Sequence, residues 1–427
     1  MGKNEFKRYF VVVPDGAGDE PIDELGGKTP LEVANMPCIN GMAQRGEVGM
    51  VKTVPDGIAP GSDAANLSVM GYDPCVYLTG RSPLEAASIG IEMAATDVAF
   101  RTNIITLVDP ATGKPADETT VTPYEELVIA DHSSGDITTE EADQLIKAIA
   151  AELGTDEIAF YTGVSYRHCM IVKDGKTDYT LTPPHDVLGK GVSDNLPKYG
   201  ETLAGSEEPV FLTELMKKSY EILRKHPVNK ARIEKGLNPA NTAWIWGQGK
   251  KPALSKFVDK YGIDGSAVSA VDLIKGIAIC AGLSSVDVEG ATGTIHTNFK
   301  GKADAAIAEF ERGKQFVYMH LEGPDECAHQ GDRDGKIKCM EMIDELVVKP
   351  VVEYLSAQGD YRVLVVPDHR TPLCIRTHSS TPVPFVIYDS TDEKDVDEGR
   401  AFFEKSGSKG RSFGNGYELA DYFFERK

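Results

Sequence analysis

Several loops of this sequence carry carboxylates and imidazoles, the side chains that bind divalent metal ions in proteins. The candidates are Asp15 in "VVVPDG", Asp325 and His329 in "HLEGPDECAHQGD", Asp368 and His369 in "VVPDHR", and His378 in "RTHSSTPVP". Each one alone also fits a structural role, because an aspartate before a glycine is common in turns. Together, carboxylates mixed with imidazoles favour a pair of divalent ions such as Mn or Zn.

Ser62 in "IAPGSDAANLSVMGYDP" is a candidate nucleophile at the start of a short helix. Serine is also a favoured helix N-cap, so a purely structural interpretation stays open. A two-metal site would give the hydroxyl a chemical role. One ion lowers the pKa of an attacking hydroxyl, and the other neutralises phosphate oxygens during in-line displacement.

The elements that position these residues follow from the apolar pattern. "YFVVVPDG" and "YRVLVVPDHR" are continuous β-branched runs that stop at Asp15 and Asp368, as strands covered on both faces do. The stretch 335–358 has apolar residues at helical spacing. The alternation predicts an α/β fold with a mostly parallel sheet, whose ligands bind beyond the carboxyl ends of the strands.

The middle of the chain predicts a smaller inserted domain. A helix capped by Thr139, two short strands in 157–175 and a further helix in 212–227 suit an α+β cap. We therefore expect a discontinuous core domain over 1–78 and 241–427 and an inserted cap over 79–240. "NTAWIWGQG" is interpreted as a core strand, in which Trp244 and Trp246 pack the sheet.

Composition narrows the class of protein. A chain of 427 residues with a net charge of −21 disfavours nucleic-acid and anionic-membrane partners. Its seven cysteines form no CxxC pair, as is typical of reduced packing residues. No apolar run approaches the length of a membrane span. We expect a cytoplasmic protein with a small-molecule substrate; its oligomeric state stays open.

The ordered motifs "PDG", "PGSDAANLSVMGYDP", "PDECAHQGD", "PDHRTP" and "RTHSSTPVPFVIY" resemble those of the cofactor-independent phosphoglycerate mutases, in the short archaeal form within the alkaline phosphatase superfamily. The resemblance implies an alkaline phosphatase-like core interrupted by a substrate-covering cap. It implies exchange of 3- and 2-phosphoglycerate through a phosphoserine on Ser62, with two divalent ions (Mn or Zn, or Mg) and no organic cofactor or bisphosphoglycerate. It assigns Asp15, Ser62, Asp368 and His369 to one ion, and Asp325, His329 and His378 to the other.

Cations should bind the anionic substrate. "VSYRHC" supplies Arg167 and His168, "ADHSSGD" supplies His132, and Arg101 and Lys275 are further candidates. Each of these is also compatible with an ordinary surface charge. The alternatives are a homoserine kinase-like phosphotransferase and a metal-dependent phosphomonoester hydrolase, followed by a binding protein without catalysis. Ala328, Glu322 and Thr381 depart from the pattern of the mutases, and these changes spare the metal ligands.

Overall fold

The computed structural model describes residues 7–199 and 211–425. The chain divides into two compact units, Met1–Leu78 with Ala253–Lys427 (the first unit) and Thr79–Pro252 (the second unit). Among the residues described, no helix combines the length and apolar character needed to cross a membrane.

The first unit is built on an eight-stranded sheet in the order β11-β10-β12-β1-β13-β14-β2-β15. The strands are Ser284–Val286 (β11), Gly265–Val268 (β10), Phe316–Leu321 (β12), Arg8–Pro14 (β1), Tyr361–Val365 (β13), Val383–Asp389 (β14), Glu47–Val51 (β2) and Arg411–Phe413 (β15). The five strands from β11 to β13 are parallel, whereas β14 runs antiparallel to both of its neighbours. The predicted mostly parallel α/β sheet is confirmed.

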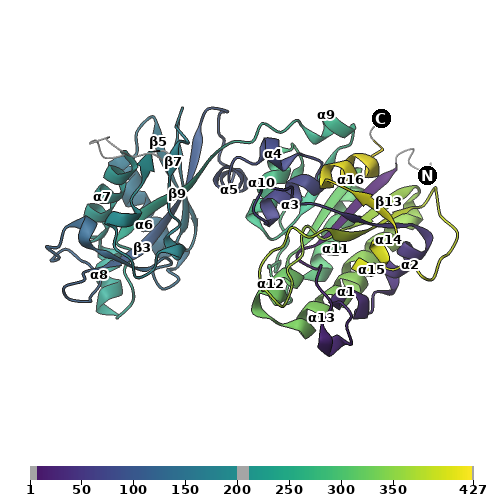
Figure 1. Cartoon of the computed structure of the whole chain (residues 1–427). Coiled ribbons are helices and arrows are strands. Elements are labelled where there is room, and N and C mark those ends of the chain that lie inside the picture. Colours follow the sequence, from purple (N-terminus) through teal and green to yellow (C-terminus); the bar gives the residue numbers. More distant parts are fainter. Residues whose placement is uncertain (1–6, 200–210, 426–427) are drawn as a thin grey trace. The chain divides into compact units, whose positions relative to one another are not determined.

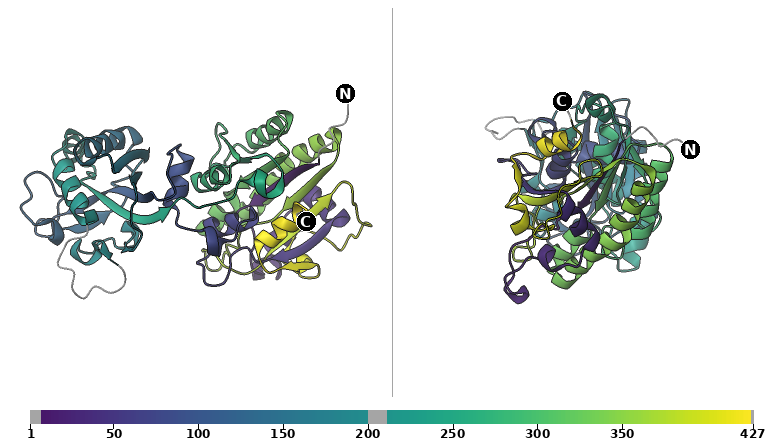
Figure 2. Two further views of the ribbon diagram at one scale, coloured as in Figure 1. Left: turned by 90° about the horizontal axis from the view of Figure 1, so that it is seen from above. Right: turned by 90° about the vertical axis from the view of Figure 1, so that its right-hand side faces the viewer.

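Helices cover both faces of this sheet (Figures 1 and 2). Tyr9 packs on Phe423 of α16, while its neighbour Phe10 packs on Phe310 of α11 from the opposite face. This alternation follows from the strand geometry, which sends successive side chains to opposite sides. The helices of the unit are Pro30–Val33 (α1), Pro37–Arg45 (α2), Ser62–Val69 (α3), Pro74–Tyr77 (α4), Phe257–Tyr261 (α9), Asp272–Cys280 (α10), Phe299–Glu311 (α11), Gly323–Gln330 (α12), Arg333–Ile343 (α13), Lys349–Gln358 (α14), Glu404–Gly407 (α15) and Gly416–Phe423 (α16).

The second unit is an antiparallel α+β structure. Its main strands are Val98–Val108 (β3), Val128–Asp131 (β4), Ile158–Val164 (β5), Arg167–Val172 (β6) and Thr242–Lys250 (β9), and Tyr179–Thr180 (β7) pairs with Lys198–Tyr199 (β8). Its helices are Ser82–Ser88 (α5), Thr139–Leu153 (α6), Phe211–Leu223 (α7) and Pro227–Glu234 (α8). Ile104 of β3 packs with Leu145 of α6 and Leu223 of α7 in one apolar cluster.

Two details of this unit differ from the prediction. The strand in "NTAWIWGQG" is β9, which pairs with β3 of the second unit and not with the core sheet, so the second unit ends beyond residue 240. A buried apolar strand has the same pattern in either sheet, and only its long-range partner separates the two cases. The cap of α6 is Thr138, whose hydroxyl accepts a hydrogen bond from the Glu141 amide; Thr139 is the first helical residue.

The two ends of the second unit lie side by side. The Thr79 hydroxyl donates a hydrogen bond to the carbonyl of Lys250. The chain therefore enters and leaves this unit at one place.

Candidate active site

The three central strands of the first unit carry the predicted ligands to one edge of the sheet. β1 pairs in parallel with both β12 and β13, so the carboxyl ends of all three strands lie together. Asp15 directly follows β1, and Asp368 follows β13. Asp325 lies on α12, which begins just after β12. This is the edge at which parallel sheets bind ligands.

Asp15, Asp368 and His369 form a first ligand group, with one ligand atom of each lying within 4.8 Å of the others. All three side chains are buried. His369 Nε2 lies 3.5 Å from Asp15 Oδ1 and 3.4 Å from Asp368 Oδ2. Burial, together with the charge of Asp368, raises the pKa of Asp15 well above its usual value. Asp15 Oδ1 is buried and has no hydrogen-bond partner among the residues described. Such an oxygen calls for a cation.

The Ser62 hydroxyl faces this group. Ser62 is the first residue of α3, whose N-cap is Gly61, so the interpretation of Ser62 as the helix cap is wrong. Its Oγ lies 3.2 Å from His369 Nε2. The hydroxyl is therefore available for a ligand or for chemistry.

Asp325, His369 and His378 form a second ligand group by the same distance criterion, and His329 adjoins it. His329 Nε2 lies 3.1 Å from Asp325 Oδ2 and 3.1 Å from His378 Nε2. His329 Nδ1 lies 3.0 Å from the carbonyl of Arg376, which can only accept a hydrogen bond. Nδ1 therefore carries a proton, which makes Nε2 the nitrogen that can bind a metal.

In the second group a protonated imidazole lies beside the carboxylate. Burial disfavours the charge of Asp325, but hydrogen bonds from His329 and His378 hold the pKa of this carboxyl well below its usual range. The same hydrogen bond raises the pKa of His329 to about 9. A divalent ion would supply the positive charge that the proton on His329 supplies here. Carboxylates mixed with imidazoles therefore fit divalent ions in both groups.

Two further residues, Thr371 and His320, support the ligands, and neither is among the predicted site residues. The Thr371 hydroxyl donates to Asp325 Oδ1 and lies 3.2 Å from His369 Nδ1, so it connects the two groups. His320 Nε2 lies 3.0 Å from Asp15 Oδ2. Polar residues inside the apolar strand "FVYMHL" were the available signal in the sequence for His320.

A buried ion pair holds the two ligand loops together. Lys336 Nζ donates to Asp19 Oδ2 at 2.7 Å, to the Gly18 carbonyl at 3.2 Å and to the Thr371 carbonyl at 2.9 Å. Both charged side chains are fully buried. The loop after Asp15 is thereby tied to the loop after Asp368.

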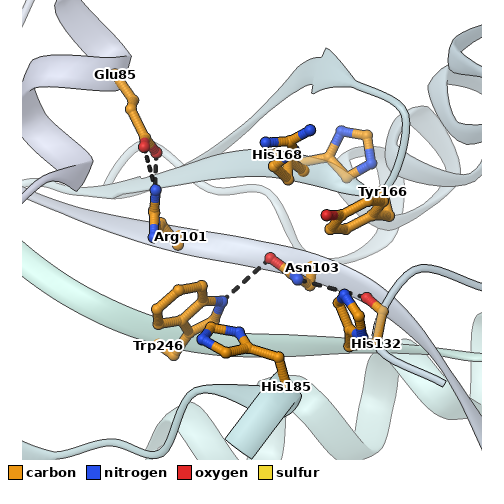
Figure 3. Close-up of a pocket in the computed structure, with 9 residues that line it drawn as sticks. Glu85, Arg101, Asn103, His132, Tyr166, His168, His185 and Trp246 are labelled. Atoms are coloured by element: carbon orange, nitrogen blue, oxygen red, sulfur yellow. Dashed lines mark hydrogen bonds and ion pairs between the residues drawn. The ribbon is translucent and has the colours of Figure 1, made fainter. Parts of the chain in front are cut away.

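The second unit contains a polar pocket of about 360 Å³ (Figure 3). It is lined by Glu85, Arg101, Asn103, His132, Tyr166, Arg167, His168, His185 and Trp246. The Arg101 guanidinium pairs with Glu85 and lies over the Trp246 ring, 4.7 Å from its centroid. Trp246 Nε1 donates to Asn103 Oδ1 at 3.1 Å. These contacts hold a cation and an aromatic face in fixed positions.

Two imidazole nitrogens in this pocket are unsatisfied. His132 Nδ1 and His168 Nε2 are buried without a hydrogen-bond partner in the described part of the chain. The other nitrogen of His168 accepts a hydrogen bond from the Gly163 amide at 3.1 Å. Burial lowers the pKa of His168 to about 3, so this imidazole is neutral at physiological pH. Its free Nε2 therefore carries the proton and can donate to an anion.

The pocket gathers four of the five candidate substrate residues, namely Arg101, His132, Arg167 and His168. The fifth, Lys275, lies on α10 of the first unit, where its Nζ is 2.6 Å from Asp287. Trp244 packs in the core as predicted, but Trp246 also lines the pocket, which corrects its interpretation as a packing residue alone. Asn103 and His185 had no distinguishing pattern in the sequence.

A family model and the similar proteins described here carry the same family description. The family model described as 2,3-bisphosphoglycerate-independent phosphoglycerate mutase matches residues 43–229. A probable 2,3-bisphosphoglycerate-independent phosphoglycerate mutase of Geobacter sulfurreducens is 45% identical and covers 98% of this chain and 100% of its own. A 2,3-bisphosphoglycerate-independent phosphoglycerate mutase of Methanosarcina barkeri is 45% identical over 94% of this chain and 95% of its own.

Two solved structures are similar to this chain over nearly its whole length. A protein from Pyrococcus horikoshii has a TM-score of 0.77 at 27% identity, with 98% of this chain and 97% of that chain covered. A cofactor-independent phosphoglycerate mutase from Thermoplasma acidophilum has a TM-score of 0.65 at 25% identity, with 98% and 99% covered.

Proposed function

Because the chain belongs to the family of 2,3-bisphosphoglycerate-independent phosphoglycerate mutases, we propose that it interconverts 3-phosphoglycerate and 2-phosphoglycerate through a phosphoserine at Ser62. The observation that carries this proposal is the 3.2 Å contact between the Ser62 hydroxyl and His369 Nε2. His369 belongs to both ligand groups, so the hydroxyl lies beside the place where two ions would bind.

The residues that would hold the ions follow from the two groups. Asp15, Ser62, Asp368 and His369 would hold one divalent ion, and Asp325, His329 and His378 would hold the other; Mn and Zn suit these ligands. Bound divalent ions lower the pKa of a coordinated hydroxyl and neutralise charge on phosphate oxygens.

The transfer then has two steps. Ser62 Oγ loses its proton and attacks the phosphorus of 3-phosphoglycerate, the bond from phosphorus to the 3-oxygen breaks, and that oxygen takes up a proton to leave glycerate. The 2-hydroxyl of the same glycerate loses its proton and attacks the phosphoserine, so Ser62 Oγ leaves, takes up a proton again, and 2-phosphoglycerate forms. Backbone N–H groups at the start of α3 favour the anionic phosphate.

The second unit is proposed to retain the glycerate. Arg101, His132, Arg167 and His168 line this pocket, and the buried Nε2 of His168, which has no partner among the described residues, is a donor that suits a carboxylate or phosphate. We leave Lys275 out of this set, because it lies on α10 of the first unit and does not line the pocket. Retention of glycerate is what separates a mutase from a phosphatase.

The test is conversion of 3- to 2-phosphoglycerate by the Mn²⁺-loaded protein without bisphosphoglycerate. Ser62→Ala should lower the rate by at least about 10³-fold, since the nucleophile is lost. Ser68→Ala, on the same helix, should retain the wild-type rate. Equal rates for wild type and Ser62→Ala would contradict the proposal. Release of inorganic phosphate as the main product would indicate a hydrolase, and ATP-dependent phosphorylation of homoserine would indicate the kinase.

A further inference from the structure

A chain of buried hydrogen bonds connects β12 to the nucleophile's ligand group. Tyr318 Oη lies 2.6 Å from Asn66 Oδ1. Asn66 Nδ2 lies 2.9 Å from Asp368 Oδ2 and 2.8 Å from the carbonyl of Ser62. Tyr318, Asn66 and Asp368 are fully buried.

The partners determine which way the Asn66 amide points. The Asp368 carboxylate and the Ser62 carbonyl can only accept hydrogen bonds, so both must face the NH₂ end of the amide. Oδ1 is left for Tyr318, whose hydroxyl must therefore donate. Each hydrogen of the amide has its own acceptor, and the amide cannot flip without placing its oxygen against Asp368.

These contacts also determine which oxygen of Asp368 faces the ligand group. Asp368 Oδ1 accepts from the backbone N–H groups of Gly16 at 3.1 Å and His369 at 2.8 Å. Oδ2 accepts from Asn66 and is the oxygen that lies 3.4 Å from His369 Nε2, on the side of the ligand group. Asn66 therefore sets the rotation of the carboxylate that brings Oδ2 toward that group.

We propose that Asn66 and Tyr318 are positioning residues. They hold the Asp368 carboxylate and the backbone at Ser62 in the orientation that binds the metal ion shared by Asp368 and Ser62. This inference rests on the proposed function, because the proposed function is what requires that ion. Tyr318 acts through Asn66, and Asn66 acts through Asp368 and Ser62, so neither touches substrate.

The experiment is a titration of metal-free, full-length protein with Mn²⁺. Calorimetry and the paramagnetic resonance signal of free Mn²⁺ measure the binding. Tyr318→Phe keeps the ring and removes the donor, and Asn66→Ala removes the whole link. Tyr124→Phe is the matched control, because its buried hydroxyl lies 3.3 Å from Thr242 Oγ1 in the second unit. Loss of a group that orients a metal ligand typically costs about 10- to 100-fold in affinity.

We expect Tyr318→Phe to weaken one of two Mn²⁺ sites by about 10-fold or more. The other site and the KM for 3-phosphoglycerate should stay near wild type, and excess Mn²⁺ should restore kcat. Asn66→Ala should show a larger loss. Wild-type affinity at both sites in a folded Tyr318→Phe protein, or an equal loss in Tyr124→Phe, would overturn the proposal. Different results would contradict the proposed function: a wild-type protein that binds no Mn²⁺, or a Ser62→Ala variant that is fully active.

Discussion

His369 Nε2 lies 3.2 Å from the hydroxyl oxygen of Ser62, although 307 positions separate the two residues in the sequence. The same nitrogen lies 3.5 Å from Asp15 Oδ1. One imidazole therefore contacts both the candidate nucleophile and a carboxylate ligand.

Gly16→Ala should disrupt the second ligand group. Gly16 has a φ of +63°, and a Cβ at this position would lie 2.4 Å from Asp325 Oδ1 and 2.7 Å from Thr371 Oγ1. Gly26 has a similar φ of +67° but open space around it, so Gly26→Ala is a matched control. Both variants should lose about 1 kcal/mol of stability from the left-handed backbone. Only Gly16→Ala should also lose Mn²⁺ affinity, measured by calorimetry; equal affinities in the two variants would contradict the prediction.

Lys336→Met should destabilise the protein strongly. The substitution leaves the buried Asp19 carboxylate without its cation, a change that typically costs about 3–5 kcal/mol. Lys300→Met removes an exposed lysine paired with Asp304 and should cost less than about 1 kcal/mol. Urea unfolding of the metal-free protein, followed by circular dichroism, compares the two. Similar unfolding midpoints would show that the buried pair does not stabilise the fold.

Stability of the second unit should fall as the pH drops from 6.5 to 5. Burial lowers the pKa of His168 to about 3 in the folded state, whereas an unfolded histidine titrates near its ordinary value of 6.5. In this window the unfolded state binds more protons, so the free energy of unfolding decreases by up to about 1.4 kcal/mol per pH unit.

Trp244 and Trp246, the two tryptophans of the chain, both lie in the second unit, so their fluorescence reports its unfolding. His168→Asn should flatten the dependence on pH, while His296→Asn, which removes an exposed histidine of the first unit, should not. A slope that His168→Asn leaves unchanged would assign the effect to other groups.

Arg101→Met should raise the KM for 3-phosphoglycerate at least about 10-fold, because it removes a fixed cation from the pocket. Lys230→Met removes a lysine paired with Glu118 in the same unit and should have no effect. Steady-state kinetics with the Mn²⁺-loaded proteins provide the comparison. A KM that is unchanged in Arg101→Met would exclude this residue from substrate binding.

The sequence predicts the site best where a potential metal ligand directly follows an apolar strand. Asp15 and Asp368 follow apolar strands, and this pattern predicts that they lie at one edge of a sheet. Asp325 and His329 are four residues apart on α12, as the helical interpretation required. The structure brings all of these together with Ser62, His369 and His378.

What the sequence could not predict depends on long-range pairing. β9 has the apolar pattern of a core strand, yet its partner is β3 of the second unit. Tyr318 and Asn66 have ordinary neighbours in the sequence, and only the packing of α3 beside β12 gives them their roles. His185 reaches the pocket from a short 3₁₀ turn, which has no recognisable periodic pattern.

The hydrogen bond from Thr79 to Lys250 has an evolutionary consequence. A segment whose entry and exit strands meet can be lengthened, shortened or exchanged without stretching the sheet from which it departs. Selection can therefore remodel this module while the first unit, encoded on either side of it, keeps its geometry.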